Sequence, residues 1–132
     1  MKVVLAGAFG NLGFEILKVL TANGCEVVAA DLKERENNGL EGKYVFRAID
    51  ATDPETLKGL CDGVEVVITT MGLTTASTKF TAYDIDYRGN LNLYAGHQAR
   101  HIFGSGSCGL FSIRLGMPGF LLWTFPFIGT GL

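Results

Sequence analysis

The stretch VVLAGAFGNLG, residues 3–13, decides the fold because it joins an apolar run to a helix-forming run through three evenly spaced glycines. An uninterrupted apolar run of this kind is typical of a strand in a parallel sheet that is covered on both faces. Gly7 lets the chain turn sharply, Gly10 leaves no Cβ between the backbone and a ligand, and Gly13 lets the helix pack close to the strand. The first N–H groups of a helix lack internal partners and carry partial positive charge, so the stretch predicts a site for the pyrophosphate of a dinucleotide.

An acidic residue supports this interpretation. The next apolar run, residues 25–30, ends at Asp31, about twenty residues after the glycines, where a carboxylate can accept the hydroxyl groups of a ribose. The glycines alone would fit a strand–helix turn without a ligand equally well. The combination of the turn, its flanking elements and the acid favours the nucleotide site.

The composition excludes several classes of protein. With 132 residues the chain has the size of one domain, and its net charge of −2 provides no basic surface for nucleic acid. The three cysteines (Cys25, Cys61 and Cys108) lack CxxC spacing and are odd in number, which argues against a disulfide framework. The first apolar run is too short for a signal peptide, so we expect a cytoplasmic protein.

Strand and helix patterns alternate along residues 1–100. Strands are expected at residues 2–6, 26–30, 44–49 and 64–70, and helices at residues 11–22, 54–61 and 83–99. The first helix carries a stripe at helical spacing that we expect to be buried, formed by Leu12, Ile16, Val19 and Leu20. Asp53 is the expected N-cap of the second helix, with Pro54 at its first position. The alternation predicts an α/β fold, a Rossmann-like doubly wound parallel sheet in the order 3-2-1-4.

The composition changes after Arg100. Residues 102–132 contain one charged side chain, Arg114, and seven glycines. Short apolar runs at residues 101–103 and 110–113 are candidates for a fifth strand, but neither has a clear pattern. We therefore expect residues 101–132 to form an irregular, apolar, Gly- and aromatic-rich tail, as in a truncated chain, whose aromatic side chains could join two copies as a homodimer. Its prolines and glycines argue against a membrane span.

Four motifs, in order, resemble those of the short-chain dehydrogenase/reductase superfamily, and in particular its atypical, NmrA-like branch. They are residues 7–13 (GAFGNLG), 50–57 (DATDPETL), 66–72 (VVITTMG) and 83–93 (YDIDYRGNLNL). The resemblance covers about residues 1–100, and within it Asn92 matches a helix asparagine of the superfamily.

The resemblance implies a role for each residue of an NAD(P) site. Gly7, Gly10 and Gly13 would hold the pyrophosphate, with Phe9, Asn11 and Leu12 in the same loop. Asp31 would meet the adenosine ribose, Asp50 the adenine amino group and Ala51 the adenine ring, while Thr70, Met71 and Gly72 would line the ribose on the nicotinamide side. The charge of Asp31 favours NAD over NADP, although Lys33 and Arg35 nearby leave NADP open.

The catalytic pair of the superfamily is missing. Its members protonate a carbonyl with a Tyr that is followed four residues later by Lys, and no Tyr of this chain has that partner, so no catalytic residue is assigned. His97 and His101 have the spacing of zinc ligands but lack a third ligand, so no metal site is expected. Three functions stay open: an NAD(P)-dependent oxidoreductase acting on an unknown small substrate, a non-catalytic dinucleotide-binding redox sensor, and a truncated inactive fragment.

Overall fold

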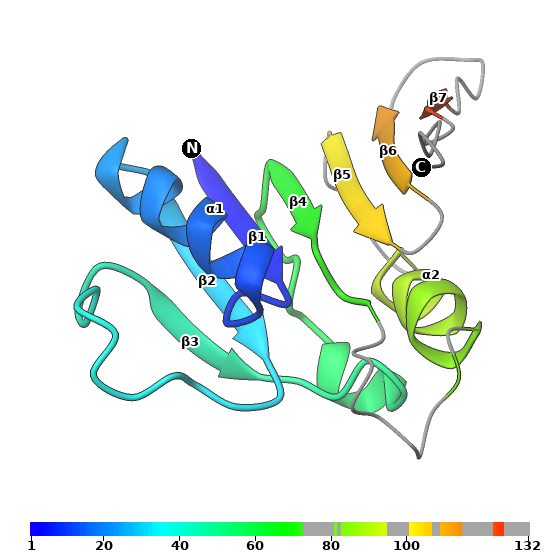
Figure 1. Ribbon diagram of the computed structural model, residues 1–132, viewed down its shortest axis with the longest axis horizontal. Helices are drawn as coiled ribbons and strands as arrows, with labels where there is room; N and C mark the ends of the chain where they lie inside the picture. Colours follow the sequence, from blue (N-terminus) through cyan, green and yellow to red (C-terminus); the bar gives the residue numbers. More distant parts are fainter. Residues whose placement is uncertain (73–80, 82, 95–100, 107–108, 115–122, 126–132) are drawn as a thin grey trace, which may run out of the picture.

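The computed structural model describes residues 1–72, 81, 83–94, 101–106, 109–114 and 123–125, whose strands form one sheet in the order β3-β2-β1-β4-β5-β6-β7. Five strands run parallel to one another: β1 (Lys2–Ala6), β2 (Glu26–Asp31), β3 (Val45–Ala48), β4 (Val66–Thr69) and β5 (His101–Gly106). Two antiparallel strands, β6 (Gly109–Arg114) and β7 (Trp123–Phe125), extend the sheet on the side opposite β3 (Figure 1).

The expected order 3-2-1-4 is confirmed. Within it, Val4 of β1 is paired with Val28 of β2 on one side and with Val67 of β4 on the other. The chain order therefore reverses at β1, with β2 on one side and β4 on the other. In open α/β sheets the ligand crevice lies beyond the carboxyl ends of the strands at such a point.

The structure differs from the irregular tail expected after residue 100. In the described ranges, β5 continues the parallel sheet beside β4, with Val66 paired to His101, and β6 folds back on β5. Glycine in a strand leaves no side chain to pack and weakens the alternating pattern by which strands are found in sequence. The runs at residues 101–103 and 110–113 were therefore the correct candidates, although their pattern was too weak to assign them.

Helix α1 (Asn11–Ala22) has the expected bounds and ends at Asn23 and Gly24, the latter at φ +72°. The expected buried stripe is correct for Ile16 and Leu20, which pack against an apolar core cluster, and wrong for Leu12 and Val19, which are 51% and 61% exposed, respectively. Gly13 and Leu17, four residues apart, face the sheet instead. Glycine has no apolar side chain, so a hydrophobic pattern does not count Gly13 as buried. The stripe expected from the pattern is therefore displaced by about one residue from the face that contacts the sheet.

The second expected helix is a single turn of 3₁₀ helix, η1 (Pro54–Leu57), and the prediction that it extends to Cys61 is wrong. The expected N-cap is confirmed, since Asp53 accepts a hydrogen bond of 3.0 Å from the N–H of Glu55. The helix stops because Lys58 (ψ 129°) and Gly59 (φ +69°) form a turn that is closed by a hydrogen bond of 3.1 Å from the N–H of Leu60 to the carbonyl of Leu57.

The third expected helix begins as a π-helix, η2 (Tyr83–Gly89), and continues as α2 (Asn90–Tyr94). The remainder of that prediction, residues 95–99, lies outside the described residues. A π-helix has one residue more per hydrogen-bonded turn and often occurs at functional sites.

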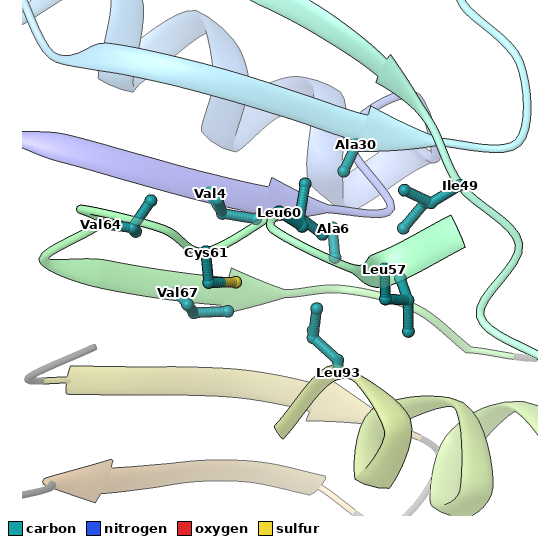
Figure 2. Packing of buried hydrophobic residues seen from close by; sticks show 10 residues of the cluster. All are labelled: Val4, Ala6, Ala30, Ile49, Leu57, Leu60, Cys61, Val64, Val67 and Leu93. Carbon is teal, nitrogen blue, oxygen red and sulfur yellow. The ribbon is translucent and has the colours of Figure 1, made fainter. Parts of the chain in front are cut away.

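Helix α1 lies over one face of the sheet (Figure 1), and Leu57 of η1 and Leu93 of α2 belong to the apolar cluster of the other face. Alternate side chains of β1 pack on opposite faces of the sheet. Leu5 joins Leu17 of α1 in one apolar cluster, while Val4 and Ala6 belong to the other. Figure 2 shows this second cluster, which Leu93 of α2 completes. None of the described helices has both the length and the apolar character that a membrane crossing requires.

Candidate functional site

A cavity of about 620 Å³ lies where β1, β2, β3 and β4 end, a volume within the range of small-molecule and cofactor sites. Segments far apart in sequence meet there, because the carboxyl ends of parallel strands share one edge of the sheet. The lining consists of Gly7, Phe9, Gly10, Asn11, Asp31, Leu32, Lys33, Ile49, Asp50, Ala51, Thr70, Met71, Gly72 and Ile85. All the sequence-predicted site residues are among them except Leu12 and Gly13.

The three glycines of the first turn differ in what surrounds them. Gly7 adopts φ +78°, and a Cβ there would lie 2.8 Å from Oγ1 of Thr70. A Cβ on Gly13 would lie 1.9 Å from the carbonyl oxygen of Gly7, a distance at which the two atoms overlap. At Gly10 the nearest atom to a Cβ would be the same oxygen at 3.5 Å, an ordinary contact. Packing within the protein therefore requires glycine at positions 7 and 13, whereas position 10 has free space beside the cavity.

Helix α1 presents N–H donors at this end of the sheet that have no hydrogen-bond partner among the described residues. The N–H of Phe14 donates to the carbonyl of Gly10 at 2.9 Å, which is the first i to i−4 bond of the helix. The N–H groups of Asn11, Leu12 and Gly13 precede that bond, and no side chain caps the helix. Leu12 and Gly13 do not line the cavity, but their N–H groups belong to this first turn of the helix. Together with the helix dipole, these donors favour a negatively charged group.

Asp31 ends β2 with both carboxylate oxygens engaged by backbone donors. Its Oδ2 accepts a hydrogen bond of 2.9 Å from the N–H of Phe9, and its Oδ1 accepts one of 2.8 Å from the N–H of Leu32. Each carboxylate oxygen can accept more than one hydrogen bond, so the group keeps capacity for the hydroxyls of a ligand. The first of these bonds also attaches the glycine loop to the end of β2.

The two basic residues that follow Asp31 have different environments. Lys33 lines the cavity. Arg35 instead donates a hydrogen bond of 3.0 Å to the carbonyl of Phe9, and its guanidinium lies 4.3 Å from the centre of the Phe14 ring. Arg35 therefore contacts the glycine loop, whereas Lys33 faces the cavity.

Asp50 and Ala51 follow β3 and are held by neighbouring side chains. Oδ1 of Asp50 accepts hydrogen bonds from the N–H (2.9 Å) and the hydroxyl (2.6 Å) of Thr52. The carbonyl of Ala51 accepts a hydrogen bond of 2.9 Å from Nδ2 of Asn92 on α2. Gly89 backs Ala51 so closely that a Cβ at position 89 would lie 3.1 Å from that of Ala51. This wall of the cavity is thus packed against the third helical segment.

The end of β4 forms the next wall. The hydroxyl of Thr69 donates to Oδ1 of Asn90 at 2.7 Å, and both side chains are buried. The Thr70 hydroxyl lies 3.0 Å from the carbonyl oxygen of Gly7, beside the first turn. Met71 and Gly72 continue the lining. The ends of β1 and β4 therefore contact each other directly at the base of the cavity.

Sequence reasoning did not assign four lining residues to the site, although it named one of them, Lys33, as a neighbour of Asp31 that leaves NADP open. Leu32 and Lys33 directly follow the predicted acid, and Ile49 directly precedes Asp50, so a rule that includes the neighbours of each strand-end acid would have found them. Ile85 comes from the π-helix, and no local signal marks it. Among the residues that the structure describes, no group of three or more His, Cys, Asp or Glu side chains is arranged to hold a metal ion.

Comparison with protein families and solved structures agrees with this geometry. The sequence matches the model of the NAD dependent epimerase/dehydratase family over residues 3–108. A UDP-glucose 4-epimerase from Thermus thermophilus, in complex with NAD, superposes with a TM-score of 0.60 and 22% identity over 70% of this chain and 32% of its own. An L-threonine dehydrogenase from Clostridium difficile superposes with a TM-score of 0.60 and 24% identity, over 69% of this chain and 31% of its own.

A third solved structure, WbmH from Bordetella bronchiseptica with NAD⁺, gives a TM-score of 0.59 and 19% identity over 70% of this chain and 33% of its own. At these identities the likeness establishes a shared fold. The chain spans about a third of the length of these enzymes. A search of curated proteins found no match.

Proposed function

Because the chain belongs to the NAD-dependent epimerase/dehydratase family, we propose that its cavity binds NAD, with the pyrophosphate at the turn of residues 7–13. The observation that carries the proposal is the open space at Gly10 beside the unpaired N–H groups at the start of α1. Packing within the described part of the protein does not require glycine at position 10, and a bound pyrophosphate would account for the missing Cβ. The NAD complexes of the epimerase and of WbmH support the same assignment.

The charges of the cavity support a dinucleotide whose phosphates meet backbone donors. Asp31 and Asp50 contribute negative charge to the lining, and Lys33 is its one cationic residue in the described part of the chain. The pyrophosphate would be stabilised by the dipole and N–H groups of α1. The oxyanions would approach the backbone at Gly10 without a side chain between them.

The adenosine end of the cofactor would lie between the ends of β2 and β3. Asp31 would accept the ribose hydroxyls with its remaining lone pairs, and its charge would repel a 2′-phosphate, which favours NAD over NADP. Asp50 would face the adenine amino group, with Ala51 beside the ring. The nicotinamide-side ribose would lie along Thr70, Met71 and Gly72, beyond the end of β4.

For the whole protein we propose an oxidoreductase- or epimerase-type reaction on a small substrate, with NAD supplying or accepting the hydride. The residues of this chain would bind and orient the cofactor. The substrate is unknown, and the finer assignment to the NmrA-like branch stays a prediction. A non-catalytic redox sensor is the second candidate, since no Tyr of the chain has Lys four residues later.

Calorimetric titration with NAD, NADH, NADP and NADPH tests the proposal. We expect saturable binding, tighter for NAD and NADH than for the phosphorylated pair. Turnover of carbonyl substrates by the binding protein would support the enzyme, and binding without turnover would support the sensor. If none of the four dinucleotides binds, the proposed function is wrong.

A further inference from the structure

The peptide group between Phe9 and Gly10 is fixed from both of its polar ends. Its carbonyl, on Phe9, accepts a hydrogen bond of 3.0 Å from the guanidinium of Arg35. Its N–H, on Gly10, donates to the carbonyl of Gly7 at 3.2 Å. Because a peptide group is planar, these two bonds define its orientation about the chain axis. This is the peptide that directly precedes the open N-terminus of α1.

The side chain of Phe9 anchors the same point of the loop. Phe9 is 9% exposed, and its ring meets the rings of Tyr44 (5.6 Å between centroids) and Phe46 (5.9 Å) edge-on. The Tyr44 hydroxyl in turn donates to Glu34 and accepts from Asn38, both at 2.6 Å. The segment between β2 and β3 therefore encloses Phe9, and Arg35 is the residue of that segment that contacts the loop backbone.

The position of Arg35 differs from the one that its sequence separation from Asp31 suggested. A basic residue shortly after the acid could bind the 2′-phosphate of NADP. Here the guanidinium is occupied by the Phe9 carbonyl and the face of the Phe14 ring. A guanidinium that lies over an aromatic ring and donates a hydrogen bond loses both contacts if it moves toward an anion elsewhere.

We propose that Arg35 is a positioning residue, which holds the Phe9–Gly10 peptide in the orientation that the pyrophosphate requires, and that it is not a ligand of a 2′-phosphate. The claim that Arg35 affects cofactor binding rests on the proposed function, whereas the claim that Arg35 holds the loop does not. Arg35 would act on NAD and NADP alike, since both carry the same pyrophosphate.

The test compares three variants. Arg35→Met keeps a long apolar side chain over Phe14 but removes the donor, and Arg35→Lys restores a charged donor. Lys18→Met is the matched control, because the Lys18 ammonium lies 5.5 Å from the centre of the same ring and its ion pair is with Glu15. It removes one positive charge nearby without changing a hydrogen bond to the loop.

Two measurements are made on each variant. In the free protein, we expect amide hydrogen exchange at Phe9 and Gly10 to quicken about tenfold in Arg35→Met, to recover in part in Arg35→Lys, and to stay unchanged in Lys18→Met. In fluorescence titrations, NADH and NADPH should both bind about five- to tenfold more weakly to Arg35→Met, by the same factor.

Several results would overturn the inference. A selective loss of NADPH affinity would make Arg35 a phosphate ligand. Unchanged exchange, or weakening equal to that of Lys18→Met, would leave Arg35 without a positioning role. If the wild-type protein binds neither coenzyme, the proposed function fails, and hydrogen exchange alone then decides whether Arg35 holds the loop.

Discussion

The change of Gly10 to alanine should weaken the binding of NAD while leaving the stability of the fold almost unchanged. At position 10 the backbone has φ −70° and ψ 174°, which any residue adopts, and a methyl group would be 3.5 Å from its nearest neighbour, the carbonyl oxygen of Gly7. Alanine is a poorer N-cap than glycine, but it also reduces the conformational entropy of the unfolded chain. These effects are opposite and of similar size, so the free energy of unfolding should change by less than about 0.5 kcal/mol.

The effect on binding should be much larger. The added methyl group would occupy the space at which we place the pyrophosphate, so the dissociation constant for NAD should rise at least about tenfold, or about 1.4 kcal/mol. Gly10→Val fills more of that space and should abolish binding. Calorimetric titration measures the affinity, and thermal unfolding followed by circular dichroism measures stability in the absence of ligand.

Gly13→Ala is the matched control. Its Cβ would lie 1.9 Å from the carbonyl oxygen of Gly7, a backbone atom that cannot move without opening the turn. We expect a loss of about 3 kcal/mol, by analogy with severe overpacking, and a melting temperature lower by roughly 10 °C. The reasoning is refuted if Gly10→Ala melts as low as Gly13→Ala, or if it melts normally and binds NAD as tightly as the wild type.

Three further predictions concern the cavity walls and the core. Asp31→Ser should raise the affinity for NADPH relative to NADH by about tenfold, since it removes a charge that repels the 2′-phosphate; an unchanged ratio in fluorescence titrations contradicts the assignment of Asp31 to the ribose. Thr69→Val removes a buried donor to Asn90 and should lower the free energy of unfolding by about 1–3 kcal/mol, with a smaller loss for Thr69→Ser, as measured by urea unfolding. Burial raises the pKa of Cys61 to about 12, so between pH 9 and 12 the thiol ionises in the unfolded chain but stays protonated in the native one. Stability should therefore fall as the pH rises through that window, by up to about 1.4 kcal/mol per unit. Urea unfolding at several pH values should show a smaller slope for Cys61→Ala, and equal slopes would contradict the prediction.

The parts of the fold that were predictable are those whose signals are local. The bounds of β1 and α1 follow from an apolar run, three glycines and the Asn23-Gly24 stop, all within residues 2–24. The order 3-2-1-4 follows from the alternation of strands and helices. The cavity could be predicted because its residues stand at strand ends, where topology alone brings them together.

Features that depend on contacts distant in sequence were not predictable in the same way. Leu12 was expected to be buried and is exposed, because the close approach of Gly13 to Gly7 sets the rotation of α1. The 3₁₀ turn at residues 54–57 is short because Lys58 and Gly59 leave the helical conformation, and Arg47 of β3 donates to the carbonyls of Thr56 and Lys58 around it. No property of residues 54–61 by themselves indicates those donors.

Two asparagines on α2 have a mechanical consequence for the cavity. Asn90 contacts Thr69 at the end of β4, and Asn92 contacts Ala51 after β3. Side chains two residues apart on a helix point in directions that differ by about 200°. One short helix therefore hydrogen-bonds to both segments and holds them at a fixed distance from each other. The spacing between these two cavity walls is thus set by hydrogen bonds within the protein, and exchanging either asparagine would loosen one wall without touching the other.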